Sequence, residues 1–423
     1  MKLEQTTILT PVPVPAVAGS PLAVPAAEPA GLPRADSVSV GYLRAFITVM
    51  VLGHHAIIAY NPFLPIQKPA ASLTTQPQWW QAFPVLDSQR WAGFGLLNAF
   101  NDMFFMALMF LLSGLFVSSS LQRRGSGGFL RNRALRLGVP FVVAAGLVAP
   151  LAYYPAYLQA TAHPAFADFW RQWTSLGHWP AGPAWFVWVL LAFDAVAAGL
   201  FLLSPRWTGG LARLASGAKS RPLAFFALLV AVSAIVYLPM ELVFTSFRWS
   251  TFGPFTFQTS RLLFYAVYFL AGIGVGAYGL EKGLLAPDGK LARRWAAWQT
   301  ACPVVFFATL TVVIVAISAP GKKGWEIGGD LLFTLCCATS SFCFLAFFAR
   351  FARKRVAIFD SLRDNAYGMY LIHYAFASWL QLSLVSAPLS APVKGTLAFL
   401  GTVALSWGAT AALRRIPGVA RVL

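Results

Sequence analysis

Residues 42–60 form an apolar stretch, long enough to span a bilayer, that carries three groups able to do chemistry: Arg44, His54 and His55. A spacing of eleven residues puts Arg44 and His55 on nearly the same face of a helix, about 16 Å apart along its axis, while His54 points about 80° away from Arg44. Arginine binds phosphate bidentately, and histidine is a base near neutrality. A histidine pair in phase with an arginine favours a functional site over simple packing, in which Arg44 would reach to the interface.

The composition indicates a helical membrane protein. Of the 423 residues, 58% are hydrophobic and only 11% are charged, and the mean hydropathy is +0.66, whereas soluble domains carry about 25% charged residues. Apolar runs of membrane-spanning length recur along the chain, and the alternating pattern of a membrane barrel is absent. We therefore expect an all-α polytopic membrane protein, a bundle of about ten transmembrane helices. The predicted spans are 40–60, 95–118, 136–155, 184–204, 222–240, 261–279, 297–317, 328–349, 366–386 and 394–413.

Basic residues gather in alternate loops, and this pattern predicts the orientation of the bundle. With the amino terminus inside, most of the 32 lysine and arginine residues lie on the cytoplasmic side, as the positive-inside rule requires. Both termini are then cytoplasmic, and the lipid bilayer that we expect is the cell inner (cytoplasmic) membrane. The same rule explains the net charge of +18. Because no basic run is interleaved with aromatic residues, we expect no nucleic-acid partner.

Three segments differ in composition. Residues 1–36 are rich in Pro, Ala and Val, which predicts a disordered N-terminal arm, and prolines that interrupt any apolar core argue against a signal peptide. Residues 37–415 hold all the predicted spans, and residues 416–423 form a short C-terminal tail. The four cysteines lie inside apolar runs without metal-ligand spacing, so we expect no metal site.

Five stretches, in order and with matching spacing, resemble the acyltransferase 3 family of integral membrane acyltransferases. They are Arg44-x10-His55, MFLLSGLFVSSSL (109–121), FLRNRALRLGVPF (129–141), GPAWFVWVLLAFD (182–194) and DNAYGMYLIHYAF (364–376). Ala366 stands where the family usually has serine, and Leu115 where it often has an aromatic residue; neither change removes a titratable group. The short form expected for the chain, with its RNRALRLGVPF-type third span (131–141), resembles the members that succinylate osmoregulated periplasmic glucans.

The resemblance implies a transfer reaction. An acyl group (acetyl, succinyl or similar) would pass from a cytoplasmic acyl-CoA to a hydroxyl of a cell-envelope carbohydrate such as a glucan, exopolysaccharide or lipopolysaccharide sugar. Acyl-CoA is then the donor substrate, and no bound cofactor is expected. A proton-coupled transporter is the alternative, because ionisable residues inside spans are also typical of such carriers. The chain shows no inverted repeat, which argues against a transporter.

The resemblance also assigns catalytic roles. His55 would take the proton of the acceptor hydroxyl or carry the acyl group transiently, and His54 is the alternative base. Asp102, in the outer part of the second span, would orient the His55 ring as in a triad, or it marks the outer end of that helix. Arg44 would provide the cationic site at the cytoplasmic end of the first span.

A second set of residues is predicted to hold the two substrates. Arg131, Arg133 and Arg136 lie on the correct side to bind the phosphates of acyl-CoA, although the positive-inside rule also accounts for them. Ser113 and Gly114 leave a gap for the pantetheine arm or allow close helix packing.

Four further residues complete the predicted site. Tyr370 and His373 share one face of the ninth span, in its cytoplasmic half, and would hold the donor or shape the tunnel, or else pack the bundle. On the outer side, Trp185 would line the cavity or anchor the interface. His178, in the loop before it, would contact the acceptor or have no role.

Overall fold

Long apolar helices build the part of the chain that the structure describes. The computed structural model describes residues 35–63, 85–246 and 248–423, and residues from Ala35 to Leu423 form one unit. The predicted N-terminal arm lies outside the described residues, except that the first helix already begins at Ala35. The segments are α1 (Ala35–Ile57), η1 (Ile58–Tyr60), α2 (Ala92–Gly114), α3 (Val117–Arg133), η4 (Ala134–Gly138), α4 (Val139–Val143), η5 (Ala144–Val148), α5 (Ala149–Ala160), α6 (Phe166–Thr174), η6 (Gly182–Ala184), α7 (Trp185–Leu203), α8 (Trp207–Ala215), α9 (Pro222–Phe244), β1 (Trp249–Phe252), β2 (Phe255–Gln258), α10 (Leu262–Tyr278), α11 (Lys290–Arg293), α12 (Trp295–Ser318), α13 (Lys323–Phe351), α14 (Ala357–Leu384), α15 (Ala391–Leu413) and α16 (Pro417–Ala420).

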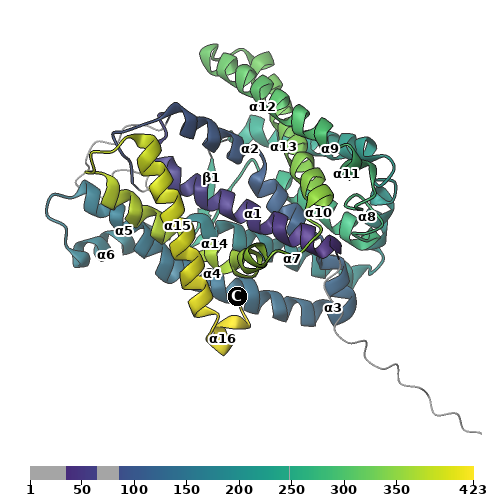
Figure 1. The fold of residues 1–423 in the computed structure, drawn as a ribbon, viewed down its shortest axis with the longest axis horizontal. Helices are drawn as coiled ribbons and strands as arrows, with labels where there is room; N and C mark the ends of the chain where they lie inside the picture. Colours follow the sequence, from purple (N-terminus) through teal and green to yellow (C-terminus); the bar gives the residue numbers. More distant parts are fainter. Residues whose placement is uncertain (1–34, 64–84, 247) are drawn as a thin grey trace, which may run out of the picture. The chain divides into compact units, whose positions relative to one another are not determined.

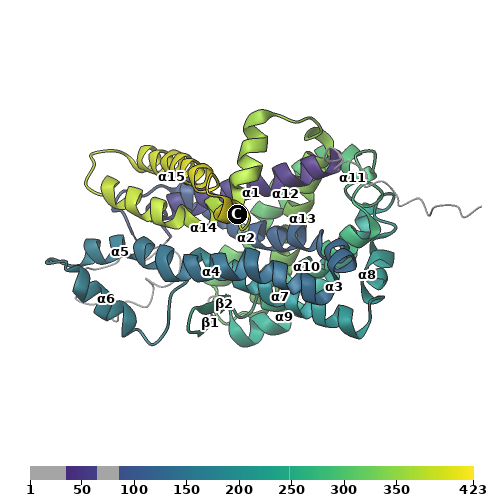
Figure 2. The same cartoon turned by 90° about the horizontal axis from the view of Figure 1, so that it is seen from below.

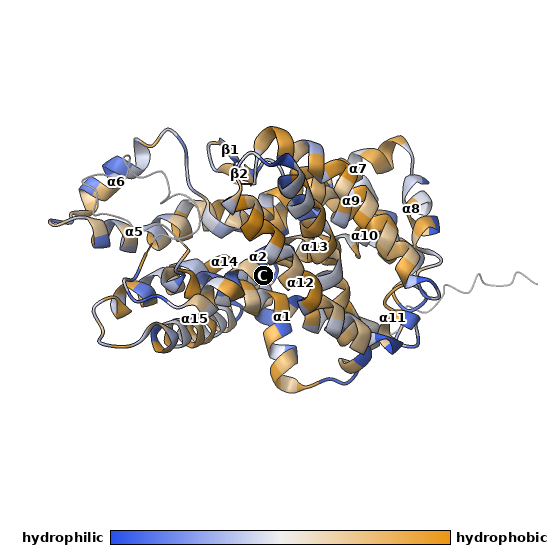
Figure 3. Cartoon of the chain, turned by 90° about the horizontal axis from the view of Figure 1, so that it is seen from above, coloured by the Kyte–Doolittle hydropathy of each residue, from blue (hydrophilic) through white to orange (hydrophobic). Residues whose placement is uncertain are grey.

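The chain is a multi-pass helical membrane protein. Among the described residues, eight helical segments are long and apolar enough to cross a bilayer, and Figure 3 shows hydrophobic residues along α9, α10 and α13 and hydrophilic ones at α6 and α11. The other two predicted spans correspond to α10, an apolar helix of 17 residues, and to α14, which carries charged residues in its first turns. The predicted count of ten and the predicted orientation therefore stay predictions.

The predicted third span is the middle of one much longer helical run. Residues Val117–Ala160 continue through α3, η4, α4, η5 and α5, with two π-helical turns at η4 and η5. Such turns are often found at functional sites, and η4 contains Arg136. Within α3 the helical geometry breaks at Gly125, whose φ of 66° is a conformation that other residues rarely adopt.

Helix α1 lies between α14 and α15 on one flank and α2 and α13 on the other (Figures 1 and 2). This position buries the faces of α1 that carry His54 and His55. We call the side of the bundle on which α1 begins the proximal side and the opposite side the distal side. Helix α14 begins on the proximal side, because Tyr42, near the start of α1, contacts Val356 and Asp360. Helices α2 and α13 end there, since the first half of α1 contacts the last turns of both, and so does α15, whose end contacts the first turns of α14.

Two features fix the structure on the distal side, where α1 ends and α7 begins. Strands β1 and β2 form an antiparallel hairpin in which Trp249 is opposite Gln258, and Trp188 of α7 donates a hydrogen bond to the hairpin at Thr256. Before α2, Asp87 forms an ion pair with Lys394 of α15 at 2.8 Å, and both side chains are 1% exposed. Because breaking a buried ion pair leaves an uncompensated charge, this contact fixes the segment after α1 to α15.

Candidate active site

Two histidines from opposite ends of the chain meet inside the bundle. His55 comes from the last turn of α1 and His373 from the middle of α14, and Nε2 of His373 lies 3.1 Å from Nδ1 of His55. The rings pack at a centroid distance of 5.0 Å. His55 keeps 8% of its surface accessible, whereas His373 keeps none. The small accessible part of the pair therefore belongs to His55, and a substrate would contact that ring rather than His373.

The carbonyl groups around this pair determine where the protons sit. Nδ1 of His55 lies 3.0 Å from the carbonyl oxygen of Val51, and Nδ1 of His373 lies 2.6 Å from that of Tyr370. A carbonyl oxygen only accepts, so both Nδ1 atoms carry hydrogen in the neutral rings. The Nδ1 hydrogen of His55 is then shared between the Val51 carbonyl oxygen and Nε2 of His373, and Nε2 of His55 keeps its lone pair. Among the described residues, no hydrogen-bond partner occupies that atom, so it can take a proton.

His54 lies beside this pair but points elsewhere. Its ring packs 5.3 Å from the ring of His55 and 5.3 Å from that of Phe105, and its Nδ1 is buried without a hydrogen-bond partner among the described residues. The backbone at this point is held from two sides, because Asn98 donates to the His54 carbonyl at 3.0 Å and Gln381 donates to the His55 carbonyl at 2.7 Å. These amides fix the end of α1 and hence the position of His55.

Asp102 does not orient the His55 ring in this structure. Its carboxylate forms an ion pair with Arg261, at the start of α10, at 3.0 Å, and Arg261 also donates to the Asp102 carbonyl oxygen at 3.3 Å. The contact with the His55 ring is made by His373. The predicted triad role therefore gives way to the alternative, in which Asp102 is a boundary residue, here tied to α10.

Three arginines form a cationic cluster on the proximal side. Arg44 donates to the carbonyl oxygen of Leu112 at 3.4 Å, its guanidinium lies 5.4 Å from the ring centroid of Phe116, and it is close enough to Arg133 and Arg136 to feel their charges. The sequence predicted this cationic end of the first span, and the structure brings the R-x-x-R pair to it. Exposed Arg131 has no contact with the cluster among the described residues.

A buried carboxylate that is not among the predicted site residues balances part of the positive charge of the cluster. Asp194 of α7 is 0% exposed and lies 3.1 Å from Nε of Arg133, whose side chain is 22% exposed. The Arg133 guanidinium also lies 5.0 Å from the ring centroid of Phe129. Because a guanidinium held by a buried carboxylate loses little freedom on binding, Asp194 prepares Arg133 for an anionic ligand.

The small-residue gap at Ser113 and Gly114 is filled by a neighbouring helix. A Cβ added at Gly114 would collide with the Phe269 carbonyl oxygen of α10, and Gly272 and Gly276 approach the backbone of α2 just as closely. Ser113 donates to the Met109 carbonyl of its own helix at 2.8 Å. The close-packing alternative is therefore what the structure shows for Gly114, and no gap for a pantetheine arm remains there.

Helix α14 holds its aromatic residues against the loop before α7 and the long helix. Tyr370 donates a hydrogen bond to the Pro183 carbonyl, and Tyr367 donates to the Arg136 carbonyl at 2.7 Å. Tyr370 is thus a packing residue next to the site. His373 was predicted in the proximal half, nearer the donor. It lies instead at the depth of His55, because α14 begins at Ala357, well before the predicted start of the span.

The two predicted acceptor residues lie on the distal side. Trp185 opens α7 and packs against Trp249 of the hairpin at 5.7 Å and Tyr265 at 5.8 Å between ring centroids. His178 is half-buried in the loop before η6; burial lowers the pKa of its imidazole below the ordinary value, against a backbone hydrogen bond with Leu176 that raises it. His178 is therefore mainly neutral at pH 7 and able to accept a hydrogen bond.

Three further residues that hold the site in place are not among the predicted site residues, although each has a recognisable feature in the sequence. Asp194 and Arg261 are ionisable residues inside predicted spans, which by itself marks a functional or structural contact, and Gln381 is a buried amide in an otherwise apolar stretch. Their partners are far away in sequence, so the residue types could be noticed but the pairings could not be derived.

Comparison with known proteins gives one match, to a protein family. No curated protein and no solved structure matches the chain. A family model described as an acyltransferase domain matches residues 37–411, which covers α1, the arginine pair, α7 and both histidines. The chain belongs to the acyltransferase 3 family, and it is a membrane acyltransferase.

Proposed function

We propose that this acyltransferase moves an acyl group, such as acetyl or succinyl, from a cytoplasmic acyl-CoA to a hydroxyl of a cell-envelope carbohydrate. The expected acceptors are a glucan, an exopolysaccharide or a lipopolysaccharide sugar. One observation carries the proposal: Nε2 of His55 is left as an acceptor on the same helix that carries Arg44. A base and a phosphate-binding cation on one helix are what a CoA-dependent transfer across a membrane requires.

The arginine cluster supports binding of the donor from the proximal side. A CoA thioester carries several phosphate charges, which guanidinium groups bind bidentately. Arg44 and Arg136 supply such groups, and Arg133 is already held by Asp194. From Arg44 to His55 the rise along α1 is about 16 Å, a distance that the extended pantetheine arm bridges. The thioester would then lie beside the His55 ring.

The chemistry at His55 is a general-base transfer. Nε2 of His55 takes the proton from the acceptor hydroxyl while the oxygen attacks the thioester carbonyl carbon. The carbon–sulfur bond breaks, the CoA thiolate leaves, and the imidazolium returns its proton to the sulfur, so the free thiol and the ester are the products. His373 and the Val51 carbonyl share the Nδ1 hydrogen of His55 and so support the charged form of the ring, in the way that a buried acceptor does in a hydrolase triad.

The distal aromatic residues support binding of the carbohydrate. Trp185 and Trp249 lie edge to face at 5.7 Å, beside Tyr265. Their apolar ring faces and polar tips suit a sugar, which has both apolar faces and hydroxyl edges. Half-buried His178 adds a neutral hydrogen-bond acceptor in the same region. The similarity of the third span to the glucan-succinylating members makes a succinyl group and a glucan our first choice.

The experiment uses the purified full chain in detergent with succinyl-CoA or acetyl-CoA and a glucan oligosaccharide. Release of the CoA thiol together with the matching mass increase on the glucan is expected. His55→Gln abolishes both, whereas the matched change His163→Gln, at an exposed loop histidine, leaves them unchanged. Accumulation of the glucan in sealed vesicles without any mass increase would contradict the proposal and favour a carrier.

A further inference from the structure

A large groove lies on the proximal half of the bundle, between α1, α13 and the start of α14. It has a volume of about 900 Å³, which is within the range of ligand-binding sites. Its residues are Tyr42, Ala45, Phe46, Val49, Gln299, Phe344, Phe347, Phe348, Phe351, Ala352, Arg353, Lys354, Val356, Phe359 and Leu362. Apart from Gln299 and the two cations, the wall consists of aromatic and aliphatic side chains.

The groove belongs to a different face of α1 from the candidate active site. Ala45, Phe46 and Val49 are turned by roughly 100–200° from Arg44 around the helix, while His55 lies within about 20° of Arg44. A molecule in the groove therefore contacts the back of α1. The groove is not part of the path between the arginine cluster and His55.

The walls of the groove are open toward the bilayer. Phe46 is 40% exposed, Phe351 51% and Phe359 49%, and the Phe46 ring packs against those of Phe344 and Phe348 at 5.5 Å each. Because these side chains belong to helices of a membrane protein, their natural contact is with hydrocarbon chains.

Positive charge lies at the proximal end of the groove only. Arg353 and Lys354 line it in the short connection between α13 and α14. Lys354 is exposed, and the described residues provide no ion-pair partner for it. Arg353 donates to the Pro287 carbonyl at 2.7 Å, a neutral partner that leaves its charge uncompensated. The remaining polar group, Gln299, donates to the Cys343 carbonyl at 2.9 Å.

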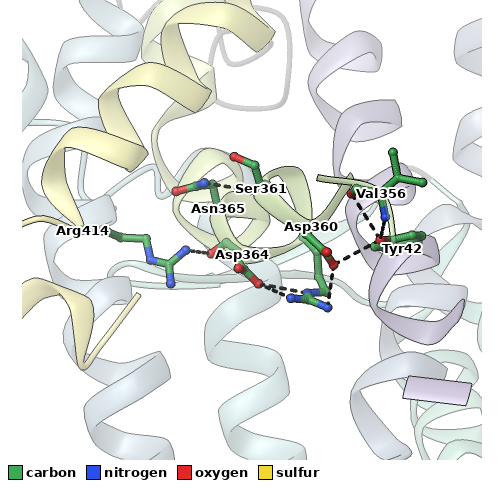
Figure 4. A network of polar contacts seen from close by, with 8 residues as sticks. Tyr42, Val356, Asp360, Ser361, Asp364, Asn365 and Arg414 are labelled. Atoms are coloured by element: carbon green, nitrogen blue, oxygen red, sulfur yellow. Dashed lines mark hydrogen bonds and ion pairs between the residues drawn. The ribbon is translucent and has the colours of Figure 1, made fainter. Parts of the chain in front are cut away.

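The connection that carries these cations is held in place by α1. The Tyr42 hydroxyl accepts from the Val356 amide at 2.9 Å and donates to Asp360 at 3.1 Å (Figure 4). Asp360 is in turn paired with Arg363 at 3.1 Å, so its negative charge does not cancel that of the two groove cations. The groove thus combines a fixed cationic end with an apolar body.

We propose that this groove binds one anionic phospholipid from the proximal leaflet. The phosphate lies at Arg353 and Lys354, and an acyl chain runs along Phe46 toward Val49. Basic pockets between transmembrane helices bind anionic head groups in this way, and the apolar body selects a lipid over a soluble phosphate. The bound lipid bridges α1, α13 and α14, and so stabilises the contact between the two helices that carry His55 and His373.

The test measures lipid binding, not acyl transfer, and is independent of the proposed reaction. The full chain is reconstituted in nanodiscs of phosphatidylcholine with or without phosphatidylglycerol, and bound lipid is counted by native mass spectrometry after release into detergent. We expect one retained phosphatidylglycerol and a higher unfolding temperature in its presence. R353Q/K354Q weakens retention of the lipid by about fivefold for each cation removed. Val49→Trp fills the membrane end of the groove and abolishes retention.

The matched control is R123Q/R124Q, which removes the same charge from two exposed arginines in α3. It should retain the lipid like the unchanged protein. Equal loss in R123Q/R124Q would mean that bulk charge and not the groove attracts the lipid, and would overturn the proposal. Retention in Val49→Trp would overturn it as well, because the acyl chain would then lie elsewhere. Each variant is first shown to elute as a single folded species.

Discussion

Nε2 of His373 and Nδ1 of His55 lie 3.1 Å apart although 318 positions separate the two residues. The contact joins the first transmembrane helix to the ninth predicted one, and together with the Val51 carbonyl it places the hydrogen of His55 on Nδ1. It leaves the other ring nitrogen as the base. A solitary histidine on α1 would have two possible tautomers, and the pair selects the one that can accept a proton from a hydroxyl.

Replacement of His55 is expected to remove the chemistry and leave binding. His55→Gln should lower kcat by about 10²–10⁴-fold, the usual contribution of a general base, with little change in the KM for acyl-CoA. His54→Gln should cost less than about tenfold, because the His54 ring packs on Phe105 and does not join the pair. Steady-state release of CoA thiol measures both. The reverse ranking would make His54 the base.

Replacement of His373 is expected to act through His55. His373→Ala removes one of the two acceptors of the Nδ1 hydrogen and leaves the Val51 carbonyl, so kcat should fall by roughly 10- to 100-fold, less than for loss of the base itself. The pH dependence of kcat should also shift, because the charged form of His55 loses a partner. A merely structural role would lower the amount of folded enzyme and leave the pH profile of the remainder unchanged.

The pair formed by Asp194 and Arg133 is expected to show strong coupling. Asp194→Asn leaves the Arg133 guanidinium without its counter-charge, and should lower the stability by about 1–3 kcal/mol and raise the KM for acyl-CoA. Arg133→Gln alone strands a fully buried carboxylate. The double variant should therefore be more stable than the sum of the two single changes predicts, as a thermal double-mutant cycle would measure. Additive losses would show that the pair is not coupled.

The glycine contacts between α2 and α10 give a prediction about packing. Gly114→Ala forces a methyl group against the Phe269 carbonyl oxygen, and overpacking of this kind costs about 1–3 kcal/mol. Gly127→Ala in α3 is the control, because a Cβ there meets no atom within 4 Å, and it should be neutral or stabilising. Thermal unfolding measures both. Unchanged stability of Gly114→Ala with a raised KM for acyl-CoA would restore the idea of a gap for the donor.

Local features of the site follow from periodicity. The common helix face of Arg44 and His55, the apolar spans and the R-x-x-R pair need only the 3.6-residue repeat and the length of a membrane crossing. The five stretches that resemble the acyltransferase 3 family are also local, and the match over residues 37–411 confirms the family. The resemblance pointed to His55 as the base, with His54 as the alternative, and this choice stays a prediction.

Contacts between helices were beyond the sequence, since they depend on how far one helix slides and tilts against another. A shift of a few residues along α14 moved His373 from the expected donor side to the ring of His55. The same uncertainty left the two interpretations of Asp102 and the role of Gly114 open, and hid the contact of Asp194. Residue spacing determines which side chains share a face, whereas only the packed bundle decides which faces meet. For this protein, the sequence by itself determined the helices and the family, and the tertiary structure decided which groups touch the base.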